Sequence, residues 1–312
     1  MKIEKALKLF SKLESDSFTQ NLIAQSWAKN ILIEAEEPKE NFPHFNEELE
    51  SQINIIALSY LNIACSLATS KEHGNVSVDA FEKAGNILSF VHFPYGGRVE
   101  KSNYYLLLSS LAFYLSSQYS KSYIVVKRAE ESSKFIRLIS LFLKKDFKNL
   151  LLEINSVIFN PNCSDAGLIK LEDELEANSK IYTVILAKAL NLVLEFVYSG
   201  RNDRLNLARE FLNDLKILTK INEDPAAWWI SRLLVLLLDT FRQFSLWSIL
   251  PPLINSQKTF AYIQHLAFNS PSIVELFYSQ VGAIQAMAKD ENIVISLPTS
   301  SGKTRSKCGM AR

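Results

Sequence analysis

Residues 203–219 read DRLNLAREFLNDLKILT, and this stretch predicts the class of the fold. Its apolar residues recur at three- and four-residue spacing, which places them on one face of a helix. Polar and charged residues fill the opposite face. Residues 46–70 show the same spacing, so the sequence predicts long amphipathic helices packed on a shared core. The apolar face of 203–219 consists of Leu205, Ala208, Phe211, Leu212, Leu215 and Leu218.

The helical pattern runs through residues 1–270, and helix start and stop signals divide it into hairpins. Gly200 is expected to end a helix over 180–199, and Asn202 to cap the next one. Asp224-Pro225 predicts a helix start, with the aspartate as N-cap and proline at the first helical position. Pro251-Pro252 is expected to stop the helix before it.

Ser270-Pro271 repeats the start signal and predicts a helix from Ile273 to Ala288. Loops are expected near 38–45, 93–102 and 159–166. No register repeats at a fixed period, so two architectures remain open for residues 1–270. These are an irregular helical bundle and an α-solenoid-like domain.

Composition excludes several classes of protein. The chain has 312 residues, 48% of them hydrophobic, and a net charge of +1, which gives no global attraction to nucleic acid. Its three cysteines and four histidines are scattered, which argues against disulfides, a zinc site or a catalytic triad. Lys144, Lys145 and Lys148 form a small basic spot that is interpreted as a solvated face.

The N-terminus lacks the apolar core of a signal peptide. The most apolar stretches, 181–199 and 226–254, are interrupted by charged residues and are predicted to be buried helices that do not cross a membrane. A soluble, cytoplasmic protein is therefore expected.

The pattern changes after residue 270. Ile293-Val294-Ile295 is a β-branched run, and it predicts a strand over 293–296. A phosphate-binding loop, Pro298-Thr299-Ser300-Ser301-Gly302-Lys303-Thr304, follows it directly. Backbone N–H groups of Ser300, Ser301 and Gly302 would surround phosphates. Lys303 would reach the β- and γ-phosphates, and Thr304 would bind Mg²⁺.

Residues 273–304 resemble the start of a superfamily-2 DEAD/DEAH-box helicase core. The resemblance rests on Gln280 and Ala283, which precede the loop at the spacing of that family, and on the amino-acid sequence of the loop itself. It implies that Gln280 contacts adenine, that Thr299 to Thr304 bind ATP with Mg²⁺, and that the parent protein acts on DNA or RNA. Leu297 departs from the family, which has a small residue there.

The family continues into an apolar helix and further motifs, whereas this sequence becomes polar after Thr304 and ends at Arg312. A downstream Asp-Glu pair and an arginine finger are missing, so no catalytic residue and no ATPase activity are predicted. The interpretation is an α-helical accessory domain over 1–270 and the truncated start of a RecA-like domain over 271–312. The alternative is an independent α-helical protein-interaction module with a vestigial P-loop tail.

Overall fold

The computed structural model describes residues 1–35, 47–70, 72–91, 99–129, 131, 133–159, 176–254, 256–269 and 272–287. Within these residues the chain is almost entirely helical, with short connections. The helices are α1 Ile3–Ser15, α2 Ser17–Glu34, α3 Glu47–Leu67, α4 Gly74–Val91, α5 Val99–Leu115, α6 Tyr119–Arg128, α7 Lys134–Leu143, α8 Phe147–Phe159, α9 Glu176–Ser199, α10 Asn202–Ile221, α11 Pro225–Phe244, α12 Leu246–Leu253, α13 Gln257–Ala267 and α14 Tyr278–Met287.

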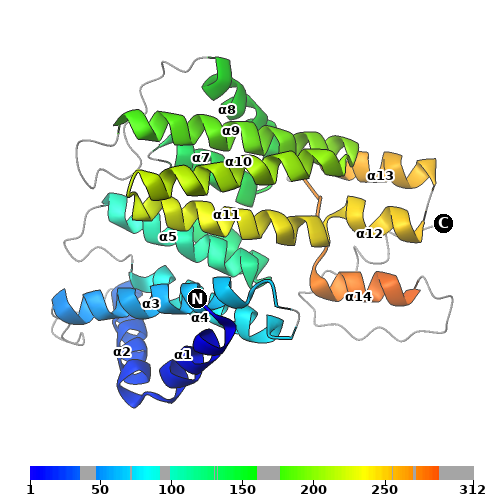
Figure 1. Cartoon of the computed structure of the whole chain (residues 1–312). Helices are drawn as coiled ribbons and strands as arrows, with labels where there is room; N and C mark the ends of the chain where they lie inside the picture. Colours follow the sequence, from blue (N-terminus) through cyan, green and yellow to red (C-terminus); the bar gives the residue numbers. More distant parts are fainter. Residues whose placement is uncertain are drawn as a thin grey trace.

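Successive helices pack as antiparallel hairpins, and the hairpins stack on one another. The helices α9, α10, α11 and α5 run side by side through the middle of the molecule, and α3 and α4 continue the stack below them (Figure 1). The helices α1 and α2 cover the α3–α4 end, and α12 to α14 lie at the side of the stack. Because α11 folds back onto α5 and α7 packs on α9, the architecture is an irregular bundle rather than an open solenoid.

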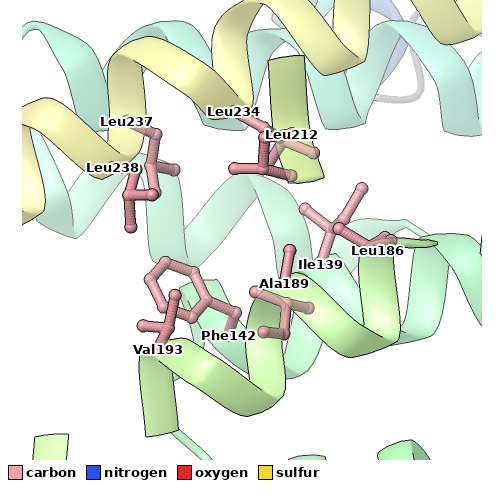
Figure 2. A pocket seen from close by; sticks show the side chains of 10 residues that line it. Ile139, Phe142, Leu186, Ala189, Val193, Leu212, Leu234, Leu237 and Leu238 are labelled. Carbon is pink, nitrogen blue, oxygen red and sulfur yellow. The ribbon is translucent and has the colours of Figure 1, made fainter. Parts of the chain in front are cut away.

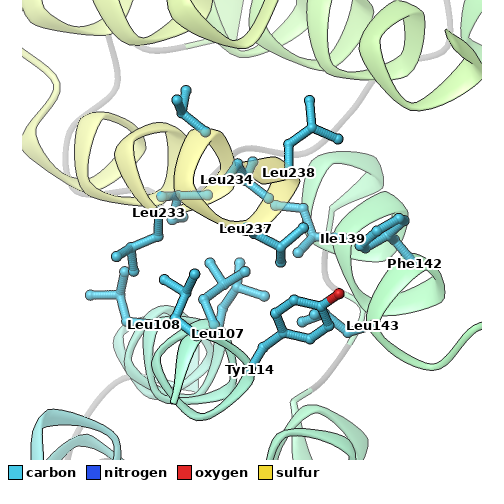
Figure 3. Packing of buried hydrophobic residues seen from close by; sticks show 14 of the residues in the cluster. Leu107, Leu108, Tyr114, Ile139, Phe142, Leu143, Leu233, Leu234, Leu237 and Leu238 are labelled. Carbon is cyan, nitrogen blue, oxygen red and sulfur yellow. The ribbon is translucent and has the colours of Figure 1, made fainter. Parts of the chain in front are cut away.

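The main core lies where α5, α7 and α11 converge. Leucines from α5 and α11 interdigitate there with Ile139 and Phe142 of α7, and the Tyr114 ring closes one side of the cluster (Figure 3). Smaller clusters fill the α5–α6 hairpin and the junction of α12, α13 and α14. Burial of these apolar faces is the main force that holds the helices together.

Several sequence predictions are confirmed. The stretch 203–219 lies inside α10, and 46–70 corresponds to α3. Gly200 follows α9 with a φ of +71°, the left-handed conformation expected of a glycine that ends a helix. Asp224 caps α11, since its side chain accepts a hydrogen bond from the Ala227 backbone N–H at 2.9 Å.

Other boundaries differ from the predictions. Arg201 is the N-cap of α10, and Asn202 is already helical. The proline pair lies in the last turn of α12, and the break in the long apolar stretch falls at Ser245 instead. Ser245 caps α12 by accepting from the Ser248 backbone N–H, and the neighbouring backbone bonds to residues 272–277. The helix α5 begins at Val99, inside the expected loop 93–102, whereas 38–45 lies outside the described residues, as does 160–166 of the third loop.

The predicted helix from Ile273 is wrong for its first turn and a half. Residues 272–277 are extended, and burial alternates along them, with Ser272, Val274 and Leu276 buried. An isolated antiparallel bridge joins Ser245 to Glu275. The helix starts only at Tyr278. In residues 272–277, every second side chain is buried and the backbone bonds to the region around Ser245. These contacts outweighed the helix-start signal of the preceding serine and proline.

The described part of 271–312 contains this extended segment and α14, and no β-strand, so a RecA-like start is not supported there. The expected strand 293–296 and the P-loop lie outside the described residues. Lys180–Ser199 within α9 is long and apolar enough to span a membrane by length and composition, but 61% of its apolar window is buried inside the bundle. It is a core helix, as the sequence predicted.

Candidate functional site

Glu275 anchors the extended segment to the helical bundle. Its side chain is only 8% exposed, and both carboxylate oxygens have partners: the Lys145 ammonium donates to Oε1, and the Tyr114 hydroxyl donates to Oε2. A buried carboxylate needs such partners, because burial without them is strongly unfavourable. One acidic residue thus connects the segment to α5 and to the α7–α8 turn.

Lys145 reaches this carboxylate through an unusual backbone conformation. It follows α7 with a φ of +57°, and the Lys145 and Asp146 N–H groups donate back to Phe142 and Leu141 at 3.0 Å each. This is the geometry that closes a helix C-terminus. The ammonium then lies over the rings of Tyr114, Phe142 and Phe241, at 4.9, 4.6 and 5.3 Å from their centroids.

This finding corrects the interpretation of the basic spot as a solvated face. Lys145 is paired inside the molecule, and Lys144 forms an ion pair with Glu131 at 2.8 Å. Little in the sequence indicated that Lys145 and Glu275 form an ion pair. Glu275 is separated from Lys145 by 130 residues, and the only hint was an acidic residue between two apolar ones, Val274 and Leu276.

Aromatic side chains surround the ion pair. Burial, reinforced by the charge of Glu275, holds the pKa of Tyr114 well above its usual range, and the same causes raise that of Tyr119. The Tyr119 ring stacks on Phe277 at 5.5 Å and meets Tyr114 edge-on at 5.0 Å. Both tyrosines therefore stay neutral, and Tyr114 serves as a hydrogen-bond donor to Glu275.

Main-chain hydrogen bonds fix the register of the same segment. Ser272 N–H donates to Lys145 O at 3.0 Å, Leu246 N–H to Val274 O at 2.9 Å, and Leu276 N–H to Phe244 O at 2.9 Å. The segment thus fills the break between α11 and α12. Side-chain and backbone contacts together determine where α14 begins.

Gln280, the predicted adenine contact, lies in the first turn of α14 and is only 2% exposed. Its Oε1 accepts a hydrogen bond from the Phe277 backbone N–H at 2.8 Å. This is the reciprocal half of a capping box, in which a Gln at the third helical position holds the N-cap N–H. The structure therefore gives Gln280 a structural role, and its contact with adenine stays a prediction.

The other predicted site residues, Thr299, Ser300, Ser301, Gly302, Lys303 and Thr304, lie outside the described residues, and so does the expected Mg²⁺ ligand among them. Their binding of phosphate stays a prediction. Within the described part of the chain, no group of three or more His, Cys, Asp or Glu side chains could hold a metal ion.

Two hollows in the described part of the chain are candidate ligand sites. A cavity of about 10 Å³ lies between α7, α9, α10 and α11 and is lined only by apolar side chains (Figure 2). It is a packing gap, because it holds at most one water and offers that water no partner. A groove of about 440 Å³ lies between α12 and α14, lined by Gln243, Phe244, Ser248, Ile249, Pro252, Leu253, Tyr278, Val281, Gly282 and Gln285.

The groove is lined by no charged side chain, and its Ser248 hydroxyl accepts a hydrogen bond from the Ser245 hydroxyl at 2.9 Å with no basic group in the lining, so the lining forms no nucleophile–base pair. The residues around Glu275 are likewise suited to positioning rather than chemistry. They hold the first turn of α14 against the bundle.

Comparison with known proteins shows which protein this chain is similar to. No protein-family model matches the chain. The chain is similar to a Hachiman protein. This relative, the Hachiman protein HamB of Bacillus cereus, is 33% identical over 310 residues, which are 98% of this chain. The chain spans about 27% of the length of HamB.

This comparison overturns the assignment to DEAD/DEAH-box helicases. The similarity to HamB runs through the helical bundle and the C-terminal segment alike, whereas the helicase resemblance rested on residues 273–304 and is supported by no family match. The interpretation of this chain as part of an ATP-dependent DEAD/DEAH-box helicase is therefore wrong. The alternative, an α-helical interaction module, agrees better with both the fold and the comparison.

Proposed function

We propose that this chain is an α-helical protein-interaction module that serves anti-phage defence in a HamB-like protein. The observation that carries the proposal is the similarity to HamB along 98% of a chain whose described residues form a helical bundle without a catalytic or metal cluster. Stacked helix pairs offer extended faces on which another protein can dock. A protein partner was already expected from the sequence.

A nucleic-acid partner was expected only for the helicase parent and does not form part of this proposal. Net charge is +1, and a protein that binds nucleic acid through phosphates needs a concentrated basic surface. The cytoplasmic location expected from the sequence agrees with action against phage inside the cell, and it stays a prediction.

The test is co-expression of the full chain with the protein encoded beside it in the same genome. Size-exclusion chromatography with light scattering should find a complex of defined stoichiometry, with a Kd in the micromolar range or tighter. Phage plating efficiency should rise when the pair is deleted from the host. A chain that remains free of that protein at micromolar concentrations, in a host whose phage resistance is unchanged by the deletion, would refute the proposal.

A further inference from the structure

The helix α2 presents an apolar stripe to solvent. Trp27 is 59% exposed and Ile31 is 49% exposed. Ala24 and Ala28 are exposed beside them. The spacing of these four residues places them on one helical face. Thr19, Leu22 and Ser26, which lie on the opposite face, are buried.

A helix with apolar residues on both sides is normally covered on both. The helix α2 packs on α1, α3 and α4, and all of these contacts lie at one end of the bundle (Figure 1). Isolated exposed apolar side chains are common and need no explanation. The exposed face of α10 is of that ordinary kind, because Glu210 and Asp214 lie between Leu207 and Ile217. No charged residue interrupts the α2 stripe.

A row of lysines lies on the neighbouring helix. Lys5, Lys8 and Lys12 are exposed on the face of α1 opposite the buried Ala6. None of them forms a side-chain hydrogen bond or ion pair with the described residues. The helix α1 packs on α2 and α3, and α2 packs on α1, α3 and α4, so the helix that carries the lysines is a direct neighbour of the helix that carries the stripe.

The acidic residues of this hairpin are already engaged elsewhere. Glu14 accepts hydrogen bonds from Lys83 of α4 and from the Tyr60 hydroxyl of α3, the latter at 2.6 Å. Asp16 caps α2 by accepting from the Thr19 N–H at 2.9 Å. Glu4 is the one acidic residue exposed on the outer face of α1, and Lys12 also attracts the Asp16 carboxylate. The helix next to the apolar stripe therefore has a net positive outer face.

We propose that the outer face of α1 and α2 docks an amphipathic helix of a partner protein, whose apolar side covers Trp27 and Ile31 and whose flanking residues are acidic. The three- and four-residue spacing of Ala24, Trp27 and Ile31 matches the seam of paired helices. Acidic flanks would pair with Lys5, Lys8 and Lys12, as charges beside such a seam select partners. A second copy of this chain fits less well, because its lysines would oppose these.

This inference deepens the proposed function, on which it rests, by naming the surface and the chemistry of the partner. The experiment titrates the full chain with two labelled helical peptides of about three heptads each. Both carry leucine at the seam, and they differ only in having glutamate or lysine at the flanking positions. Binding is followed by fluorescence anisotropy at low salt.

The glutamate peptide should bind at least about ten-fold more tightly than the lysine peptide. Trp27→Glu should weaken its binding by about ten-fold or more. Reversal of the lysines in Lys5→Glu/Lys8→Glu/Lys12→Glu should switch the preference to the lysine peptide. Ile217→Glu on α10, at a similarly exposed isoleucine, is the matched control and should change neither affinity. Circular dichroism and urea unfolding verify that each variant is folded.

Equal affinity for the two peptides, or an unchanged preference after charge reversal, would overturn the inference. So would binding of duplex DNA that depends on the lysines but not on Trp27, or a homodimer broken by Trp27→Glu. If the protein encoded beside the chain binds wild type and Trp27→Glu equally, only this surface assignment falls. If it does not bind wild type at all, the proposed function falls.

Discussion

At the scale of single residues, Glu275 is the most consequential side chain of the described structure. It is 8% exposed and neutralises Lys145, which is 19% exposed. Glu275→Ala should lower the free energy of unfolding by about 2–4 kcal/mol, because Lys145 and Tyr114 would lose their partner inside the bundle. Urea unfolding measures the loss.

Glu131→Ala is the matched control, since Glu131 pairs with Lys144 nearer the surface, where their side chains are 30% and 22% exposed. It should cost no more than about 1 kcal/mol. Replacing both members of the inner pair, with Glu275→Leu and Lys145→Met, should cost less than Glu275→Ala alone. An equal cost for Glu275→Ala and Glu131→Ala would show that the inner pair is not important for stability.

Asp224 makes the stability of α11 depend on pH. Burial raises the pKa of this carboxyl, although hydrogen bonds from the Ala227 and Ala226 backbone N–H groups lower it in part. The folded state therefore binds the proton more tightly than the unfolded chain. This favours folding fully below the unfolded pKa of about 3.9, and the benefit is lost as pH rises through the folded-state pKa.

Asp224→Asn keeps an oxygen that can cap Ala227 and removes the titration. Its free energy of unfolding relative to wild type should rise between about pH 3 and pH 7. Asp224→Ala removes the cap and should be about 1 kcal/mol less stable than Asp224→Asn at neutral pH. Urea unfolding across this pH range measures both. If the difference in unfolding free energy between Asp224→Asn and wild type did not change with pH, the raised pKa of Asp224 would be contradicted.

At the scale of elements, two of the four described glycines, Gly200 and Gly282, should respond oppositely to substitution by alanine. Gly200 has a φ of +71°, and an added Cβ would lie 2.6 Å from Cε3 of Trp247. Gly200→Ala should therefore cost about 3 kcal/mol through backbone strain and overpacking. Gly282 lies inside α14 with nothing within 4 Å of its Cβ position, so Gly282→Ala should stabilise by about 0.5–1 kcal/mol.

Thermal unfolding of the two variants provides the measurement, and each serves as the control for the other. A loss of stability in Gly282→Ala would indicate that the groove between α12 and α14 is narrower in solution than in the structure. A neutral Gly200→Ala would mean that the turn after α9 can rearrange away from Trp247.

The helices show which sequence patterns are sufficient to predict an element. The apolar periodicity of 203–219 and the Asp224-Pro225 pair depend on neighbours within a few residues, and the structure confirms the helices they predict. The extended segment 272–277 depends on backbone groups of Phe244, Leu246 and Lys145, which are distant in sequence. A local pattern cannot contain that information, so the sequence predicted a helix there.

Local sequence patterns were equally insufficient to predict the residues around Glu275. Gln280 was singled out by its spacing from the P-loop, and the structure shows it capping α14. Glu275 was missed, because its role is defined by Lys145 and Tyr114 across the fold. The helicase assignment likewise came from a short local motif. The similarity to HamB that overturns it extends over 98% of the chain.

At the scale of the whole molecule, residues 272–287 are part of the packing that closes the bundle. Val274 and Leu276 are 6% and 5% exposed, and Leu276 shares a cluster with Ile284 and side chains of α12 and α13. The predicted division of the chain at residue 270 can therefore be measured as a difference in stability between two lengths of the chain.

A chain of residues 1–270 should have a free energy of unfolding about 3–6 kcal/mol lower than a chain of residues 1–287. Two buried apolar side chains contribute about 1.5–3 kcal/mol each, and the further loss from leaving Lys145 unpaired is offset by the conformational entropy that the longer chain gives up in ordering residues 271–287. Urea unfolding with far-ultraviolet circular dichroism compares the two chains. Equal stability would mean that the bundle is complete at residue 270 and that the segment only rests on it. A large loss would mean that residues 271–287 belong to the folding unit of the bundle, so that the division at residue 270 is not a boundary in the fold.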